Sequence, residues 1–168
     1  MPGYDIRTRA GGLAEVTCYV GVCGASNATD ELYALAEEVG ARLAQGGAII
    51  ISGGRGGVME ASCKGAQRAG GTTIGLLPGD SREEGNAFAT VTIPTGMGEL
   101  RNGLIVRAAD VLIAVGGAYG TLSEIALALH AGKPVIGLQT WALGVPELIQ
   151  AETAEQAVRL AFAAARRG

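Results

Sequence analysis

Residues 111–130 read VLIAVGGAYGTLSEIALALH, and this stretch decides the fold. An uninterrupted apolar run is followed by a turn rich in glycine and then by a segment with the composition of a helix. A continuous apolar run is typical of a strand that is covered on both faces of a parallel sheet. Glycine allows the chain to pass tightly from such a strand into a helix. The stretch therefore predicts one strand–turn–helix unit of an α/β fold.

The same alternation recurs along the chain. Strands are predicted over residues 16–22, 48–52, 72–77, 89–94, 110–116 and 134–138, with a possible short strand near the end. Helices are predicted over residues 30–45, 56–70, 99–109, from 121 to about 132, and in the tail, where Thr153 and Gln156 form a capping-box pattern. The alternation predicts a doubly wound, mainly parallel, Rossmann-like sheet with helices on both faces. We expect one domain over residues 15–168, preceded by an N-terminal arm over residues 1–14.

Composition narrows the classes of function. The net charge is −3 without an internal basic cluster, so nucleic-acid binding is not expected. Three cysteines without CxxC spacing and one histidine argue against a metal site and favour buried reduced thiols in a cytoplasmic protein. No apolar run reaches the roughly 20 residues of a membrane span, and no signal peptide is recognisable. We therefore expect a cytoplasmic protein with no membrane partner.

Glycine-rich turns follow the first, second and fifth predicted strands: GVCGAS, SGGRGG and VGGAYG. In a parallel sheet these turns share the rim at the carboxyl ends of the strands, where ligands bind. The first turn lacks the GxGxxG spacing of a dinucleotide site, and no lysine follows the second as a phosphate loop of an NTPase requires. Backbone N–H groups at helix starts remain as an anion site, although close packing of helix on sheet also explains such glycines.

The residues expected to bind a phosphorylated small molecule lie in these three turns. They are Gly24, Ser26, Gly53, Gly54, Gly56, Gly116, Gly117, Tyr119, Gly120 and Thr121. Arg55 could contact an anion or lie in solvent. Glu124 has two possible roles, because Thr121 and Glu124 also fit the capping box, in which the glutamate binds the N-cap N–H group. Glu124 is thus either a helix cap or a carboxylate that faces the ligand.

The stretch VGGAYGTLSEI resembles the PGGxGTxxE motif of the LOG family, often called lysine decarboxylase-like. Members are cytokinin-activating phosphoribohydrolases, which cleave the N-glycosidic bond of nucleoside 5′-monophosphates. The resemblance extends from about Val16 to Leu138 and implies catalytic roles for Glu124 and for Arg101, which matches the arginine of the family's Arg-Lys pair. It also implies a homodimer. The family's glutamate would stabilise an oxocarbenium-like state of the sugar.

Two residues depart from that motif: Val115 replaces its proline and Asn102 its lysine. The Arg101-Asn102 pair with GGAYGTLSE is also similar to the molybdenum-cofactor carrier branch of the superfamily, whose members bind a phosphorylated pterin without established hydrolysis. Arg101 and Glu124 together favour the hydrolase, and the carrier is the alternative. Lys64 and Lys133, the only lysines, lie away from the glycine-rich rim, so a pyridoxal-dependent decarboxylase is not expected. No resident cofactor is expected.

Overall fold

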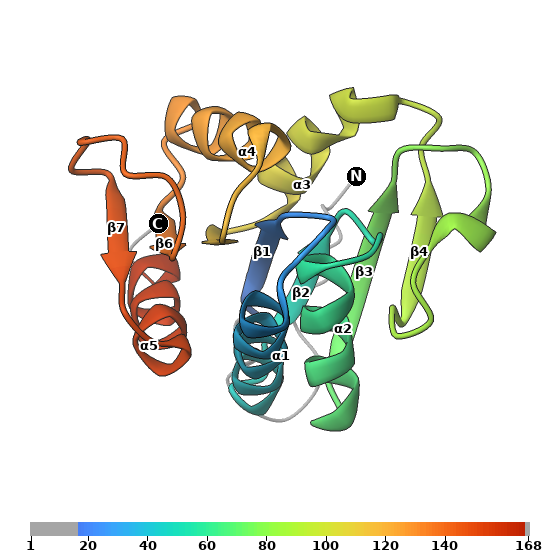
Figure 1. The fold of residues 1–168 in the computed structure, drawn as a ribbon, viewed down its shortest axis with the longest axis horizontal. Helices are drawn as coiled ribbons and strands as arrows, with labels where there is room; N and C mark the ends of the chain where they lie inside the picture. The colour runs from blue at the N-terminus through green and yellow to red at the C-terminus, as the bar shows by residue number, and fades with distance from the viewer. Residues whose placement is uncertain (1–16, 167–168) are drawn as a thin grey trace, which may run out of the picture.

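All the strands of the described chain form one parallel sheet. The computed structural model describes residues 17–166, so the arm expected over residues 1–14 lies outside the described residues. Within them, the strands are β1 (Tyr19–Gly24), β2 (Ile49–Ser52), β3 (Thr72–Leu77), β4 (Val91–Pro94), β5 (Val111–Val115), β6 (Val135–Leu138) and β7 (Leu148–Ala151). Their order is β4-β3-β2-β1-β5-β6-β7, and every neighbouring pair is parallel (Figure 1).

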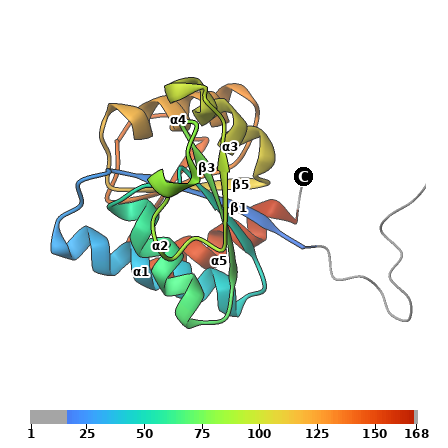
Figure 2. The same ribbon diagram turned by 90° about the vertical axis from the view of Figure 1, so that its right-hand side faces the viewer.

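Helices cover both faces of this sheet. They are α1 (Asp30–Gln45), α2 (Val58–Arg68), α3 (Asn102–Ala108), α4 (Tyr119–His130) and α5 (Ala154–Ala165), with short 3-10 turns η1 (Arg82–Glu84) and η2 (Gly98–Arg101). Figure 2 shows α1, α2 and α5 on one face and α3 and α4 on the other. The doubly wound, Rossmann-like α/β fold expected from the sequence is confirmed. Across residues 17–166, no helix has the length and apolarity needed to cross a membrane.

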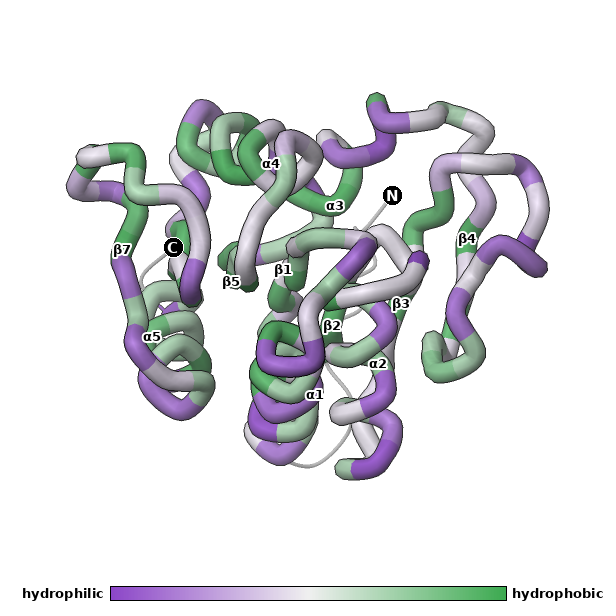
Figure 3. Tube along the Cα trace, viewed as in Figure 1, coloured by the Kyte–Doolittle hydropathy of each residue, from purple (hydrophilic) through white to green (hydrophobic). Residues whose placement is uncertain are grey.

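Two apolar layers hold the helices to the sheet. The larger layer packs buried side chains of α1, α2 and α5 against the strands, among them Val39, Leu43 and Ile50. The smaller layer packs α3 and α4 against the opposite face, with Val106, Leu112 and Ile125 at its centre. Every residue of β5 is buried, as a strand covered on both faces requires. Figure 3 shows the strand in the colour of hydrophobic residues. This burial explains why the opening stretch carries an unbroken apolar run.

Local signals place several helix ends. Thr29 caps α1 by accepting a hydrogen bond from the Leu32 N–H group at 3.3 Å. Thr153 caps α5 in the same way with the Gln156 N–H group, as the sequence predicted. The return bond of the expected capping box is shifted by one residue, because the Gln156 side chain accepts from the Glu152 N–H group instead of that of Thr153. The capping motif is thus confirmed at Thr153 and differs at its glutamine.

The chain turns in opposite directions from the two central strands, β1 and β5. From β1 it proceeds through α1 to β2, whereas from β5 it proceeds through α4 to β6 on the other side. The connections therefore diverge at the carboxyl ends of β1 and β5, which are paired along residues 20–24 and 111–115. Such a switch point leaves a crevice between neighbouring strand ends and is the usual ligand site of an open α/β sheet.

Candidate functional site

A pocket of about 270 Å³ lies at this switch point. Its walls come from the turn after β1, the turn before α2, the η2–α3 junction and the first turns of α4. The lining residues are Gly24, Ala25, Ser26, Arg55, Met59, Glu99, Arg101, Asn102, Ala118, Gly120, Thr121 and Glu124. Of the residues predicted from the sequence, the structure brings Gly24, Ser26, Arg101, Gly120, Thr121 and Glu124 together in this lining. Segments far apart in the chain therefore meet at the expected rim of the sheet.

The first turn of α4 forms one wall of the pocket. The helix begins at Tyr119 after Ala118, which makes no side-chain cap, and its first hydrogen bond joins the Leu122 N–H group to the Ala118 carbonyl. The amide N–H groups before Leu122 therefore have no acceptor within the helix. Together with the positive end of the helix dipole they favour an anion. A phosphate of suitable size would meet these groups at the pocket wall.

The capping role considered for Glu124 is wrong. Because α4 begins at Tyr119, Thr121 lies inside the helix, and neither it nor Glu124 occupies a capping position. Thr121 is 2% exposed, its hydroxyl has no hydrogen-bond partner, and the residue lines the pocket. An unpaired buried hydroxyl is unfavourable in a folded protein. The hydroxyl of Thr140, outside the pocket lining, is also buried without a partner.

Arg101 and Glu124 face each other in the pocket wall. Their side chains are almost fully buried, and Arg101 Nη1 lies 3.9 Å from Glu124 Oε1. The same Nη1 donates a hydrogen bond to the Asn102 side-chain oxygen, whereas Arg101 Nε has no partner. The guanidinium is thus held by its neighbours, while its Nε–H group has no partner. It adds a second unsatisfied donor to the wall that contains Thr121.

Burial raises the pKa of the Glu124 carboxyl group from its ordinary value of 4.5 to about 7. The positive charge of Arg101 and a hydrogen bond from Cys23 oppose this rise, and the negative charge of Glu99 adds to it. Removing water from around a carboxylate disfavours its charged form, which is why burial dominates. A carboxyl group with a pKa near neutrality can either donate or accept a proton at ordinary pH.

Five of the predicted glycines are explained by packing alone. At Gly24 a Cβ atom would lie 2.5 Å from the Val58 side chain, and at Gly117 it would lie 2.7 Å from Trp141 Nε1. At Gly53 a Cβ atom would lie 2.6 Å from Arg101 Nη2. Gly54 and Gly116 have positive φ angles of 69° and 61°, which glycine adopts most readily. Apart from Gly24, these glycines are absent from the pocket lining.

Gly120 differs from the others because the fold does not require a glycine there. A Cβ atom at this position would meet nothing within 4 Å, and its backbone is helical. Glycine near a helix start lowers helix stability by up to about 1 kcal/mol relative to alanine. Gly120 lines the pocket, so the space left by its missing side chain is open to a ligand. Gly56, the remaining predicted glycine, lies outside the lining, with only the Ser26 carbonyl oxygen near its Cβ position.

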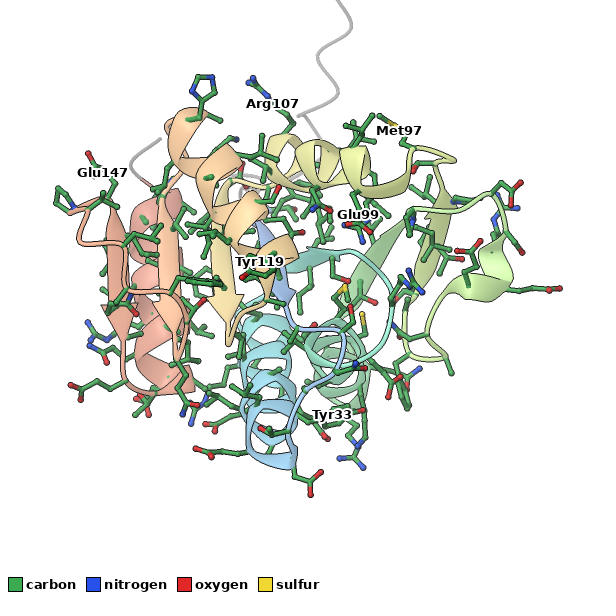
Figure 4. The ribbon with its side chains drawn as sticks, turned by 45° about the horizontal axis from the view of Figure 1, so that its top comes forward. Tyr33, Met97, Glu99, Arg107, Tyr119 and Glu147 are labelled. Carbon is green, nitrogen blue, oxygen red and sulfur yellow. The ribbon has the colours of Figure 1, made fainter. Side chains whose placement is uncertain are left out.

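Tyr119 lies next to the pocket rather than in its lining, and its side chain is 83% exposed. Figure 4 shows it at the beginning of α4, with Glu99 on the segment that leads into α3. Arg55, for which the sequence left two roles open, is exposed and lines the pocket. Glu99 and Met59 also line the pocket, and the sequence identified neither of them. The only sequence signal for Glu99 is its position close to Arg101, and that for Met59 is its position just after the second glycine-rich turn.

The two lysines are occupied elsewhere. Lys64 forms an ion pair with Glu37 at 3.0 Å, and Lys133 donates a hydrogen bond to the Ala109 carbonyl at 2.7 Å. Neither residue lines the pocket. Within residues 17–166, no group of three or more histidine, cysteine or acidic residues could hold a metal ion. The chemistry of the pocket therefore depends on its arginines, its carboxylates and the start of α4.

Comparison with known proteins identifies the family of the chain. The model of the SLOG cluster4 family matches residues 17–166. A protein of Archaeoglobus fulgidus is 46% identical over 143 residues, which cover 83% of this chain and 91% of that protein. The cytokinin riboside 5′-monophosphate phosphoribohydrolase of Mycobacterium tuberculosis is 32% identical over 128 residues, covering 71% of this chain and 68% of the enzyme.

Two solved structures are similar over almost their whole length. The molybdenum cofactor binding protein of Rippkaea orientalis has a TM-score of 0.83 and 35% identity, covering 88% of this chain and 96% of that one. The Moco carrier protein of Chlamydomonas reinhardtii has a TM-score of 0.82 and 33% identity, covering 90% of this chain and 99% of that one. The resemblance to LOG proteins drawn from VGGAYGTLSEI is confirmed, and the chain belongs to the SLOG cluster4 family.

Proposed function

We propose that the pocket binds a phosphorylated pterin of the molybdenum-cofactor type and that the protein carries this ligand without converting it. The observation that supports this proposal is the pair of buried donors in one wall, the Thr121 hydroxyl and Arg101 Nε, which both lack a partner. The phosphate would bind the N–H groups at the start of α4 and the Thr121 hydroxyl. Arg101 Nε would donate to a further oxygen of the ligand.

The carrier is preferred to the hydrolase, which the sequence favoured, for two reasons. The similar molybdenum-cofactor proteins match over 96% and 99% of their length, whereas the phosphoribohydrolase matches over 68%. In addition, Asn102 stands where the hydrolase motif has lysine, and its side chain accepts a hydrogen bond from Arg101. Compared with lysine, asparagine at this place gives the pocket wall one positive charge fewer. Its side-chain oxygen also holds Arg101 in position.

The carrier proposal is tested by ligand content. The protein would be produced in a host that makes molybdenum cofactor, and the molybdenum and pterin bound per chain would be measured by mass spectrometry. We expect both to copurify with the wild type and to be lost from Thr121→Val and Gly120→Ala. Gly103→Ala, a helix substitution outside the pocket, is the matched control and should keep them. Equal ligand content in all four proteins would refute the assignment.

A second candidate is hydrolysis of a nucleoside 5′-monophosphate, and the Glu124 carboxylate favours it. With the phosphate held at α4, a carboxylate in the same wall could stabilise positive charge on the sugar and accept a proton from water. The water oxygen would bond to C1′, the C1′–N bond would break, and the base would leave with a proton. Incubation with a panel of nucleoside monophosphates tests this idea by release of free base. Binding without release, in wild type and Glu124→Gln alike, would exclude the hydrolase.

We also infer that two copies of the chain pair through the face formed by η2, α3 and α4. Leu100 is 79% exposed there, and Leu104 and Leu127 are partly exposed on the same side of the sheet. Pairing of two such faces would remove these apolar side chains from water. Light scattering coupled to size-exclusion chromatography is expected to give the mass of a dimer and, for Leu100→Asp, that of a monomer. A wild-type monomer at micromolar concentration would contradict this inference.

A further inference from the structure

An aromatic pair stands beside the pocket. Tyr119 is the first residue of α4, and Trp141 follows β6; their ring centroids lie 6.0 Å apart with a tilt of 33° between the planes. Trp141 is the only tryptophan of the chain. At this distance two aromatic rings attract each other, but the pairing leaves Tyr119 largely open to solvent. The tyrosine therefore presents ring surface that no side chain of the described residues covers.

Trp141 is fixed firmly to the glycine-rich turn. Its Nε1–H group donates to the Ala118 carbonyl at 3.3 Å, and its own carbonyl accepts from the Gln150 side chain at 3.1 Å. Gly117 lies directly against the indole, since a Cβ atom there would be 2.7 Å from Nε1. The backbone around Tyr119 and the ring behind it are thus held in one arrangement. A ring fixed in this way loses little further freedom when a ligand binds.

The place of Tyr119 in the chain connects it to the pocket. Its neighbours on both sides, Ala118 and Gly120, line the pocket, and Gly120 leaves free space next to it. Figure 4 shows Tyr119 at the start of α4, the helix end expected to hold the phosphate. A single exposed tyrosine needs no explanation. An exposed tyrosine that is supported by tryptophan and flanked by two pocket residues points to contact with the ligand.

We propose that Tyr119, supported by Trp141, is the stacking surface for a planar heteroaromatic ring of the ligand. This inference rests on the proposed phosphate site at the start of α4 and adds the part of the ligand that the pocket walls do not explain. The phosphate would fix one end, and the ring would lie against Tyr119. The site would then select phosphorylated compounds that carry a flat ring over phosphorylated sugars without one.

Two probes separate the ring from the phosphate. 6-Hydroxymethylpterin phosphate carries both groups and has no glycosidic bond to cleave, whereas ribose 5-phosphate carries only the phosphate and a sugar. Affinities would be measured by isothermal titration calorimetry for wild type, Tyr119→Ala and Tyr119→Phe. Stacking on an aromatic side chain strengthens binding by roughly 5- to 150-fold. We expect Tyr119→Ala to lose this factor for the pterin, Tyr119→Phe to keep it, and ribose 5-phosphate to bind all three proteins equally.

The outcomes distinguish the stacking surface from the phosphate site. If the wild type binds neither probe, the phosphate site is refuted and the stacking surface with it. If the pterin binds all three proteins equally, or if Tyr119→Ala weakens both probes by the same factor, only the stacking surface is refuted. Emission from Trp141 gives a second measurement: the pterin should change it in the wild type and ribose 5-phosphate should not. An unchanged emission with bound pterin would also overturn the proposal.

Discussion

Replacing Glu124 by glutamine should stabilise the protein at alkaline pH and have little effect at acidic pH. The pKa of Glu124 is raised from 4.5 to about 7, chiefly because the carboxyl group is buried. The folded state therefore holds a proton that the unfolded chain releases as pH rises above about 4.5. The free energy of unfolding therefore falls between about pH 4.5 and about pH 7, and it becomes constant again above about pH 7. Glutamine has the shape of the protonated acid and does not titrate.

The magnitude follows from the change in proton affinity. Each unit of pKa corresponds to about 1.4 kcal/mol. The rise in the pKa of Glu124 from 4.5 to about 7 therefore corresponds to about 3 kcal/mol. The unfolding free energy of Glu124→Gln minus that of the wild type should therefore increase by about 3 kcal/mol between about pH 4 and about pH 8. The attraction of Arg101 is already contained in this value, because it opposes the rise in the pKa. The Glu124–Arg101 ion pair thus offsets only part of the cost of burial.

Urea denaturation at constant ionic strength measures this difference at each pH. Glu147→Gln is the matched control, since Glu147 is exposed and lies outside the pocket lining; its difference from the wild type should stay nearly constant. A constant difference for Glu124→Gln as well would show that the carboxyl group does not titrate near neutrality. Burial of Glu124 would then not raise its pKa, whatever the effect of the variant on ligand binding.

Three further predictions concern the pocket wall. Thr121→Val removes a buried unpaired hydroxyl, so it should raise ligand-free stability by about 1 kcal/mol while weakening phosphate binding about tenfold, measured by denaturation and calorimetry; lower stability with unchanged binding would contradict this. Gly120→Ala and Gly103→Ala should each stabilise a helix by up to about 1 kcal/mol, but only Gly120→Ala should reduce binding; equal affinities would exclude Gly120 from the site. Gly53→Ala places a methyl group 2.6 Å from Arg101 Nη2 and should destabilise by about 1–3 kcal/mol and abolish binding. Intact binding by Gly53→Ala would show that the position of Arg101 is not critical.

The fold was predictable because its signals are local. Apolar runs, the glycine-rich turns after three strands and threonine caps such as Thr153 each act within a few residues. The doubly wound order then follows from rules for parallel connections. The start of α4 was not predictable to the residue: TLSE fits a capping box, yet the helix begins two residues earlier, at Tyr119. Nothing in the local sequence weighs a cap at Thr121 against packing of this turn on Trp141.

Contacts between distant segments set the details of the site. The sequence indicated a shared rim, but it could not show that Gly53 lies close to Arg101 or that Trp141 packs on Gly117. These contacts join residues 48 and 24 positions apart, and they depend on side-chain packing in three dimensions. The same limit explains why Glu99 was missed. A carboxylate in the first turn of a helix looks the same in sequence whether or not a pocket lies beside it.

Three features of the pocket are each unfavourable for the folded chain alone. Glu124 is a carboxyl group buried deeply enough to raise its pKa to about 7, Thr121 has a hydroxyl without a partner, and Gly120 leaves a helix position without a side chain. Conservative substitutions such as Glu124→Gln, Thr121→Val and Gly120→Ala would relieve each of them. Sites where a sequence departs from its stability optimum are commonly functional. All three departures lie in one pocket, so a bound ligand explains them together where separate packing arguments fail.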